Sequence, residues 1–131
     1  MLMKLKIDNT VDGPFTTYFK NGKPSCEGHH LNGKKTGEWK YHLTNGVLKA
    51  IGHYENDLIV GQWTWWRKNG ELWQTGQFDD KELKEGLWTR YHENGNLHDV
   101  GHYKASKKVG EWKYYDKDGK LTKNQNIKPK T

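Results

Sequence analysis

The chain has 131 residues, enough for one domain, and only 32% of them are hydrophobic, which excludes a large two-layer core. Aromatic residues make up 13% of the chain, with seven tryptophans, so a few large rings must supply most of the buried surface. The net charge is +6, but four lysines lie in the acid-free stretch 120–131, and the rest of the chain is nearly balanced. Nucleic-acid-binding proteins concentrate basic charge on a folded face, so we do not expect a nucleic-acid partner.

Residues 1–12 form a separate N-terminal region. The opening sequence, MLMKLKIDNT, has no long apolar segment, so it predicts neither a signal peptide nor a membrane span, and we expect a cytoplasmic protein. Within this region LMKLKI is either an edge strand added to the domain that follows or a frayed tail. Cys26 is the single cysteine, which excludes an internal disulfide.

Residues 13–123 consist of one segment in four complete copies and one half copy. The copies are spaced by 24 residues, with one step of 25, and they begin at Gly13, Gly37, Gly61, Gly86 and Gly110. In each copy the third position is aromatic and positions 9 and 10 are Asn-Gly or Asp-Gly; position 16 is glycine in the four complete copies. Self-similarity at a fixed period of this length indicates a repeat protein.

Each copy predicts a β-hairpin. Asn-Gly between two β-prone runs favours a type I′ turn, and no segment shows the 3.6-residue period of a helix. The predicted fold is therefore all-β: a single-layer, twisted antiparallel β-meander of about ten strands built from ~24-residue hairpin repeats. The extra residue falls in the charged connection 79–85, and residues 124–131 are predicted to be a basic, disordered tail.

The turn position predicts the register of the sheet. Position 3 then lies opposite position 16, and position 6 opposite position 13; we also assume that position 18 lies opposite position 1 of the next copy. This register predicts a row in which aromatic rings alternate with glycines, each ring covering a glycine that has no Cβ. We interpret this row as the structural spine, formed by Phe15, Gly28, Trp39, Gly52, Trp63, Gly76, Trp88, Gly101 and Trp112.

The opposite face of the predicted sheet carries a second group of rings. Trp66, Trp73 and Tyr91 would lie side by side at mid-sheet, and the repeat does not require a tryptophan at Trp73. Clustered exposed rings are typical binding anchors. The predicted partner-binding residues are Trp66, Trp73, Tyr91, Lys49 and His98. The alternative is that these rings only cover an otherwise bare sheet.

Catalytic and metal-binding patterns are not found in the sequence. His29, His53 and His102 share position 17, but equivalent positions lie about 9.6 Å apart, too far for one zinc ion. The assumed register instead places His29 opposite Glu38 and His102 opposite Glu111. No nucleophile, metalloprotease or phosphate-loop motif is present, so we expect no enzyme activity, no metal and no cofactor.

The frame G-x-W-x-x-Y-x-x-N-G-x-L-x-x-x-G-x-Y, present from Gly86 to Tyr103, resembles the MORN repeat in its divergent bacterial variant form. The resemblance covers about 110 residues. It implies a non-catalytic scaffold that contacts proteins or lipids, and some bacterial relatives are described as antitoxins.

Three classes of binding function follow. The first is a protein-interaction module, either an antitoxin-like neutraliser or an assembly scaffold. The second is a carbohydrate- or cell-wall-binding module, in which indoles stack on sugars, although such arrays are usually exported. The third is binding to a phospholipid surface, which rests only on the resemblance and the basic tail. An open sheet edge also allows a homodimer.

Overall fold

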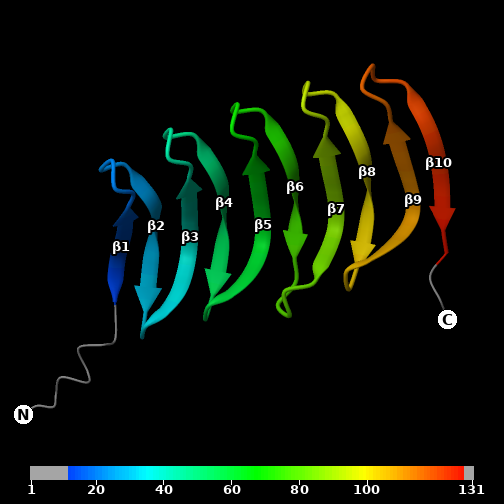
Figure 1. Cartoon of the computed structure of the whole chain (residues 1–131). Helices are drawn as coiled ribbons and strands as arrows, with labels where there is room; N and C mark the ends of the chain where they lie inside the picture. Colours follow the sequence, from blue (N-terminus) through cyan, green and yellow to red (C-terminus); the bar gives the residue numbers. More distant parts are fainter. Residues whose placement is uncertain (1–11, 129–131) are drawn as a thin grey trace, which may run out of the picture.

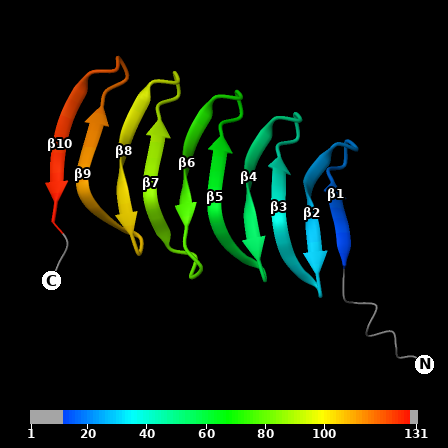
Figure 2. The ribbon, with the colours of Figure 1, turned by 180° about the vertical axis from the view of Figure 1, so that it is seen from behind.

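Ten strands form a single antiparallel sheet in the computed structural model, which describes residues 12–128 (Figure 1). The strands are β1 (Gly13–Tyr18), β2 (Pro24–Leu31), β3 (Lys34–His42), β4 (Leu48–Glu55), β5 (Leu58–Trp66), β6 (Leu72–Phe78), β7 (Lys84–Tyr91), β8 (Leu97–Lys104), β9 (Lys107–Tyr115) and β10 (Leu121–Ile127). Each strand pairs with its neighbours in the chain, so β1 and β10 are the two edges (Figure 2). The predicted all-β meander is confirmed, and residues 12–128 contain no helix.

The predicted N-terminal region, residues 1–12, lies outside the described residues except for Asp12. The predicted disordered tail, residues 124–131, is wrong for residues 124–127, which belong to β10. In β10 Asn124 pairs with Lys113 and Ile127 pairs with Gly110. The free edge of β9 offers these residues backbone hydrogen-bond partners, and that outweighs their polar composition. Residues 129–131 lie outside the described residues.

The Asn-Gly hairpin loops have three residues, so the predicted type I′ turn is wrong in type, although its location is right. In the third repeat the N–H of Arg67 donates to the carbonyl of Glu71 at 2.8 Å, and the N–H of Gly70 donates to the carbonyl of Arg67 at 2.8 Å. Gly70 has φ of +88°, whereas Asn69 is not among the residues with positive φ. This geometry is a type I turn followed by a left-handed glycine, which adds a bulge to the hairpin.

The bulge changes the register beside each loop. Trp66 pairs with Leu72, and the shift lies between Trp65 and Trp66. The predicted pairing of position 6 with position 13 is therefore wrong, because position 13 is an extra, unpaired residue. Farther from the loop the predicted pairing holds, with Trp63 opposite Gly76.

The side chain at position 13 turns to the aromatic side of the sheet, where the spine lies, as the 3.4 Å approach of His98 Nδ1 to Asp99 Oδ2 shows. The prediction that Lys49, Trp73 and His98 lie on the face opposite the spine is wrong for this reason.

The connections between repeats are where type I′ turns occur. Asn56 and Asp57 have φ of 51° and 69°, and Ala105 and Ser106 have φ of 49° and 65°, as this turn requires. The connection with the extra residue is instead a three-residue loop in which Glu82 takes the left-handed position, with φ of 63°. The twenty-fifth residue is thus absorbed within the loop, and β7 keeps its place in the sheet.

A second bulge lies where each repeat begins. The position-1 glycines Gly37, Gly61, Gly86 and Gly110 have φ between 67° and 71°. The register between repeats shifts beside them, so His29 lies opposite Thr36 rather than Glu38. His102 likewise lies opposite Val109 rather than Glu111. The assumed pairing of position 18 with position 1 is therefore wrong, because a glycine bulge intervenes.

The tryptophan of each repeat lies over the glycine of the preceding repeat. A Cβ built on Gly76 would be 2.0 Å from Cδ2 of Trp88, so even an alanine there must displace the indole. The side chains at position 3 are 1–4% exposed in four repeats: Trp39, Trp63, Trp88 and Trp112. In each of the four, the indole N–H donates over 3.1 Å to the position-17 carbonyl of the preceding repeat: His29, His53, Gln77 and His102.

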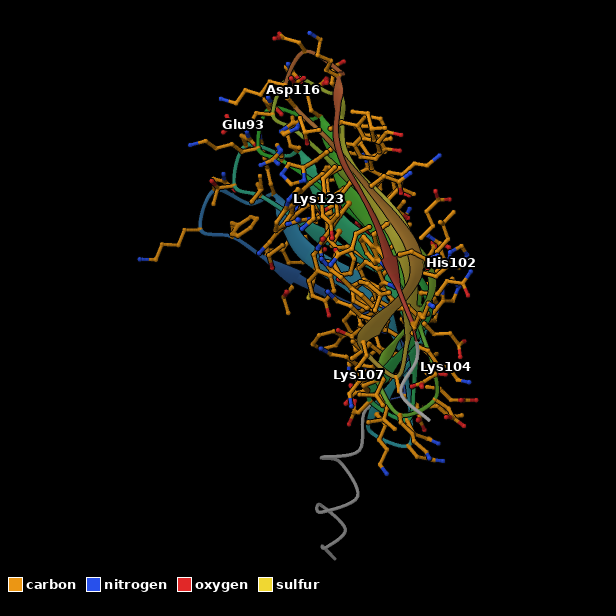
Figure 3. All side chains as sticks on the ribbon, turned by 90° about the vertical axis from the view of Figure 1, so that its right-hand side faces the viewer. Glu93, His102, Lys104, Lys107, Asp116 and Lys123 are labelled. Atoms are coloured by element: carbon orange, nitrogen blue, oxygen red, sulfur yellow. The ribbon has the colours of Figure 1, made fainter. Side chains whose placement is uncertain are left out.

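The aromatic side chains at position 18 link successive tryptophans. The ring centroid of Tyr54 lies 5.9 Å from that of Trp39 and 5.3 Å from that of Trp63, edge-on to both. Edge-to-face pairs at this separation add to the stabilisation from burial. We call this side of the sheet the aromatic face and the opposite side the back face. Viewed edge-on, the strands are bowed, with Lys123 on the hollow, aromatic side and His102 on the outer, back side (Figure 3).

Candidate interaction surface

The aromatic face is covered by its own side chains. Lys108 extends over the rings with Nζ 4.6 Å from the centroid of Trp112, and its ammonium donates to the hydroxyl of Tyr114 at 3.1 Å. Lys84 lies 4.8 Å from the ring centroids of both Trp88 and Tyr103. Burial against these rings lowers the pKa of Lys84, with further lowering from nearby cations. Because the rings carry this cover, we assign the aromatic face to stability.

One ion pair interrupts the rings of the aromatic face. Arg90 donates to both carboxylate oxygens of Asp99, from Nε at 3.1 Å and from Nη2 at 2.6 Å. Asp99 is 2% exposed. Burial alone would raise the pKa of Asp99, but the hydrogen bonds and charge of Arg90 hold it below its usual range. The corresponding residues of the second repeat, Tyr41 and Ala50, pair at the same place. In the fourth repeat the ion pair therefore takes the place of the tyrosine ring and the alanine found in the second repeat.

A hollow of about 480 Å³ lies on the concave, aromatic side of the sheet, beside the hairpin loops of the second to fourth repeats; Figure 3 shows its lining residue Glu93 on the same side as Lys123. Its lining consists of Leu43, Lys49, Trp66, Arg67, Lys68, Asn69, Trp73 and Glu93. The guanidinium carbon of Arg67 lies 5.6 Å from the ring centroid of Trp73, a cation–π contact, and Trp73 remains 39% exposed. We call this site the Trp66–Trp73 hollow.

A second hollow, of about 300 Å³, adjoins the first. Arg67, His92, Glu93, Asn94, His98 and Lys117 line it, so Arg67 and Glu93 belong to both hollows. The rings of His92 and His98 lie 4.3 Å apart between centroids, and Nδ1 of His98 is 3.4 Å from Oδ2 of Asp99. We call this site the His92–His98 hollow. The two together form one elongated depression crossed by Arg67.

The structure brings together most of the predicted partner-binding residues. Lys49, Trp66 and Trp73 line the Trp66–Trp73 hollow, and His98 lines the other. Tyr91 lines neither hollow, although its backbone carbonyl accepts a hydrogen bond from Nη2 of Arg67 at 3.0 Å.

Sequence reasoning missed Arg67 and Glu93, the two residues shared by the hollows. Both lie in hairpin loops, next to Asn-Gly pairs whose turn chemistry explained the loop without them. A cation directly after Trp66 is the available signal, because arginine commonly packs on indole rings.

Arg67 has hydrogen-bonding capacity left over. Its Nη2 is engaged by the carbonyl of Tyr91, but its buried Nε has no hydrogen-bond partner among the described residues. A buried donor without a partner costs free energy. Because Nε is buried, a ligand carboxylate or carbonyl in the hollows would accept from the outer, Nη end of this guanidinium.

The loops that frame the hollows are tied to each other. The side-chain amide of Asn94 donates to the carbonyl of Lys117 at 2.8 Å, and that of Asn21 donates to the carbonyl of Thr44 at 2.9 Å. The oxygen of Asn94 meanwhile accepts from the N–H of Asn96 at 3.0 Å within its own loop. The third loop is instead linked to the fourth repeat by the bond from Arg67 to the carbonyl of Tyr91, so the depression is shaped before any partner arrives.

The lining offers apolar area and cationic donors. Within residues 12–128, no three His, Cys, Asp or Glu side chains are grouped as metal ligands. No helix in that range is long and apolar enough to cross a membrane.

One open sheet of repeated hairpins with a preformed surface depression defines a β-repeat protein of the binding class. The family model described as MORN repeat variant matches residues 11–32, 35–56, 59–80, 84–105 and 108–128, and the chain therefore belongs to this family. The family is a non-enzymatic repeat module, and MORN repeats generally mediate interactions with proteins or membranes. Comparison with curated proteins finds no match.

Proposed function

We propose that this protein is a non-catalytic scaffold that binds a partner protein through the Trp66–Trp73 hollow. The observation that carries this proposal is Trp73, a large ring 39% exposed and held in place by Arg67 inside a preformed hollow. The sheet has a single layer among the described residues, so no second layer covers this site. Rigid rings bury much area and lose few rotamers on binding, so they dominate protein interfaces.

A protein partner fits this site better than a sugar or a membrane. Sugar stacking needs an open ring face, and the guanidinium of Arg67 lies 5.6 Å over the ring of Trp73. An anionic membrane at this site would also meet Glu93, which lines the hollow. In this proposal the protein acts in the cytoplasm, and antitoxin-like neutralisation is one form of such binding.

Affinity capture from the native host, followed by mass spectrometry, supplies candidate partners whose Kd is then measured. Trp73→Ala is expected to weaken a true partner by about 2 kcal/mol, or about thirtyfold, the usual scale of an interface hot spot. The matched control is Tyr18→Ala, because Tyr18 is an even more exposed ring, at 64%, far from the hollow. The control should keep the parent Kd.

Thermal melting separates binding from folding. Trp73→Ala should melt close to the parent protein, because the side chain is 39% exposed and packs on Arg67 beside the loops rather than among the spine rings. The proposal fails if Trp73→Ala binds every captured protein as the parent does. It fails equally if the variant loses binding to a glycan or a lipid vesicle while protein binding is unchanged.

A further inference from the structure

Resting on that proposed function, we infer that the partner presents an acidic segment with a large apolar side chain to the two joined hollows. The apolar side chain occupies the Trp66–Trp73 hollow. A neighbouring carboxylate binds Arg67, and further acidic side chains lie toward the His92–His98 hollow.

The charge of the lining supports an acidic occupant. Across the two hollows the lining includes the cations Lys49, Arg67, Lys68 and Lys117 and a single acid, Glu93. A hollow on the back face of the first two repeats has the opposite balance, with Glu27 and Glu38 against Lys40. The excess of positive charge is thus a local property of this site, because that other hollow does not share it.

Arg67 supplies the directional contact. Its guanidinium lies over Trp73, so its outer Nη donors are held beside an apolar ring rather than in open solvent. A planar guanidinium in that position matches a carboxylate, and charge-assisted hydrogen bonds of this kind are shorter and stronger than neutral ones. The arrangement selects a carboxylate next to an apolar side chain in the partner.

The apolar part of the site lies beside that cation. Leu43 and the two tryptophans lie at the Lys49 end of the depression, and Arg67 separates them from the histidine pair. A purely charged ligand would leave these rings exposed, and a purely apolar ligand would leave Arg67 unpaired. An alternation of acidic and apolar residues satisfies both.

The terminal segments of this chain do not have the charge to fill the site. Residues 1–11, MLMKLKIDNTV, carry two lysines against one acid, and residues 128–131 carry two lysines and no acid. The cationic lining would repel both segments, so neither fits as the occupant. A nucleic-acid strand fits less well, because Glu93 lies in both hollows and would face its phosphates.

The test is selection of random twelve-residue peptides displayed on phage against the immobilised full-length protein. Enriched peptides are expected to be acidic and to contain a large aromatic or aliphatic residue. Synthetic copies should lose at least tenfold in affinity for Arg67→Glu and none for Lys40→Glu, a control charge reversal on the opposite face. Thermal melts establish that each variant folds. If Arg67→Glu does not fold, Lys68→Glu, which changes an exposed side chain, is used in its place.

The outcomes separate this inference from the proposed function. Enriched peptides that are neutral or basic, or that bind Arg67→Glu as tightly as the parent, overturn the acidic-segment inference and leave protein binding intact. If no peptide is enriched and every captured protein binds Trp73→Ala with the same Kd as the parent protein, the proposed function itself is overturned. A further outcome is that the protein binds single-stranded DNA or phosphatidylserine vesicles more tightly than any peptide, in a way that depends on Arg67. That result would assign the site to those ligands and would also overturn the inference.

Discussion

Tryptophan at position 3 and glycine at position 16 act as a pair between successive repeats, and the two ends of the sheet show why. Phe15 occupies position 3 of the first repeat, where no preceding described strand offers a carbonyl to an indole N–H. Gln125 occupies position 16 of the last repeat, where no following tryptophan needs the space of a glycine. Each residue type is present where its partner is present and changes where the partner is missing.

Substitutions of Trp63 test the two contributions of the indole separately. Trp63→Ala should lower the free energy of unfolding by about 3–5 kcal/mol, as for other buried aromatic truncations. Trp63→Phe keeps most of the apolar area but leaves the carbonyl of His53 without its 3.1 Å hydrogen bond, and should cost about 1–3 kcal/mol. Urea unfolding followed by circular dichroism measures both. A Trp63→Phe protein as stable as the parent would show that the indole N–H contributes nothing.

Replacing both residues of the Arg90–Asp99 pair is predicted to be tolerated, whereas replacing Arg90 alone is predicted to destabilise the fold. Arg90→Tyr leaves a buried carboxylate without its partner and should cost about 2–3 kcal/mol, less than for a fully buried pair because half of Arg90 is exposed. The double change Arg90→Tyr with Asp99→Ala reproduces the Tyr41–Ala50 pair of the second repeat and should recover most of that loss. Denaturant melts of the two variants decide, and a double variant no better than the single one would contradict the prediction.

The same pair predicts a dependence on pH. The pKa of Asp99 is lower in the folded protein than its usual value of 3.8. A depressed carboxylate pKa stabilises the fold above the unfolded value and loses that contribution as pH falls through the folded value. The stability gap between the parent and Arg90→Tyr should therefore be full at pH 7 and narrow below about pH 4.

At the scale of elements, three of the hairpin loops are linked to the loop of the next repeat through the asparagine at position 9: Asn21, Asn45 and Asn94. Asn94 binds within its own loop through its oxygen and to the next loop through its amide. The last repeat has no successor among the described strands, and it carries Asp118 at this position. Asparagine is thus required only where a following loop can accept its N–H.

Exchanging these residues tests the link. Asn94→Asp keeps an oxygen for the N–H of Asn96 but sets a carboxylate against the carbonyl of Lys117, and should destabilise the fold by about 1 kcal/mol. The reverse change, Asp118→Asn, should have little effect because no later loop is there to bind. Thermal melts at one protein concentration compare the two. Equal shifts from both substitutions would rule out the loop-to-loop bond as the cause.

The elements were predictable because one pattern occurs in every repeat, and the local irregularities were not. Asn-Gly is compatible with two-residue and three-residue loops, and the choice depends on the register of the flanking strands. The left-handed glycine at position 1 looks the same in sequence as any other glycine, so its bulge and the shift beside His29 were missed. Trp73 was identified because no other repeat has a tryptophan at its position. Arg67 was missed because it lies beside a turn that the Asn-Gly pair already explained.

At the scale of the whole molecule, each repeat is stabilised by contacts with the repeats on either side of it. Each strand pairs with its neighbours in the chain, and each spine tryptophan binds the strand before it. In such repeat proteins the stability is approximately a sum of repeat and nearest-neighbour terms. A lesion near one end should therefore loosen that end and spare the other. A central lesion should weaken both sides, because it separates the array into two shorter ones.

Hydrogen exchange with substitutions at Trp39 and Trp88 tests this behaviour. Trp39→Ala removes the contact between β3 and β2, including the bond from the indole to the carbonyl of His29. Exchange of amides in β1–β3 should then accelerate about a hundredfold or more, the equivalent of about 3 kcal/mol, while β6–β9 keep parent protection. Trp88→Ala removes the same kind of contact between β7 and β6, at mid-sheet, and should accelerate exchange on both sides. Uniform acceleration across all strands in Trp39→Ala would mean that the sheet unfolds as one cooperative unit, and the one-dimensional description would not hold.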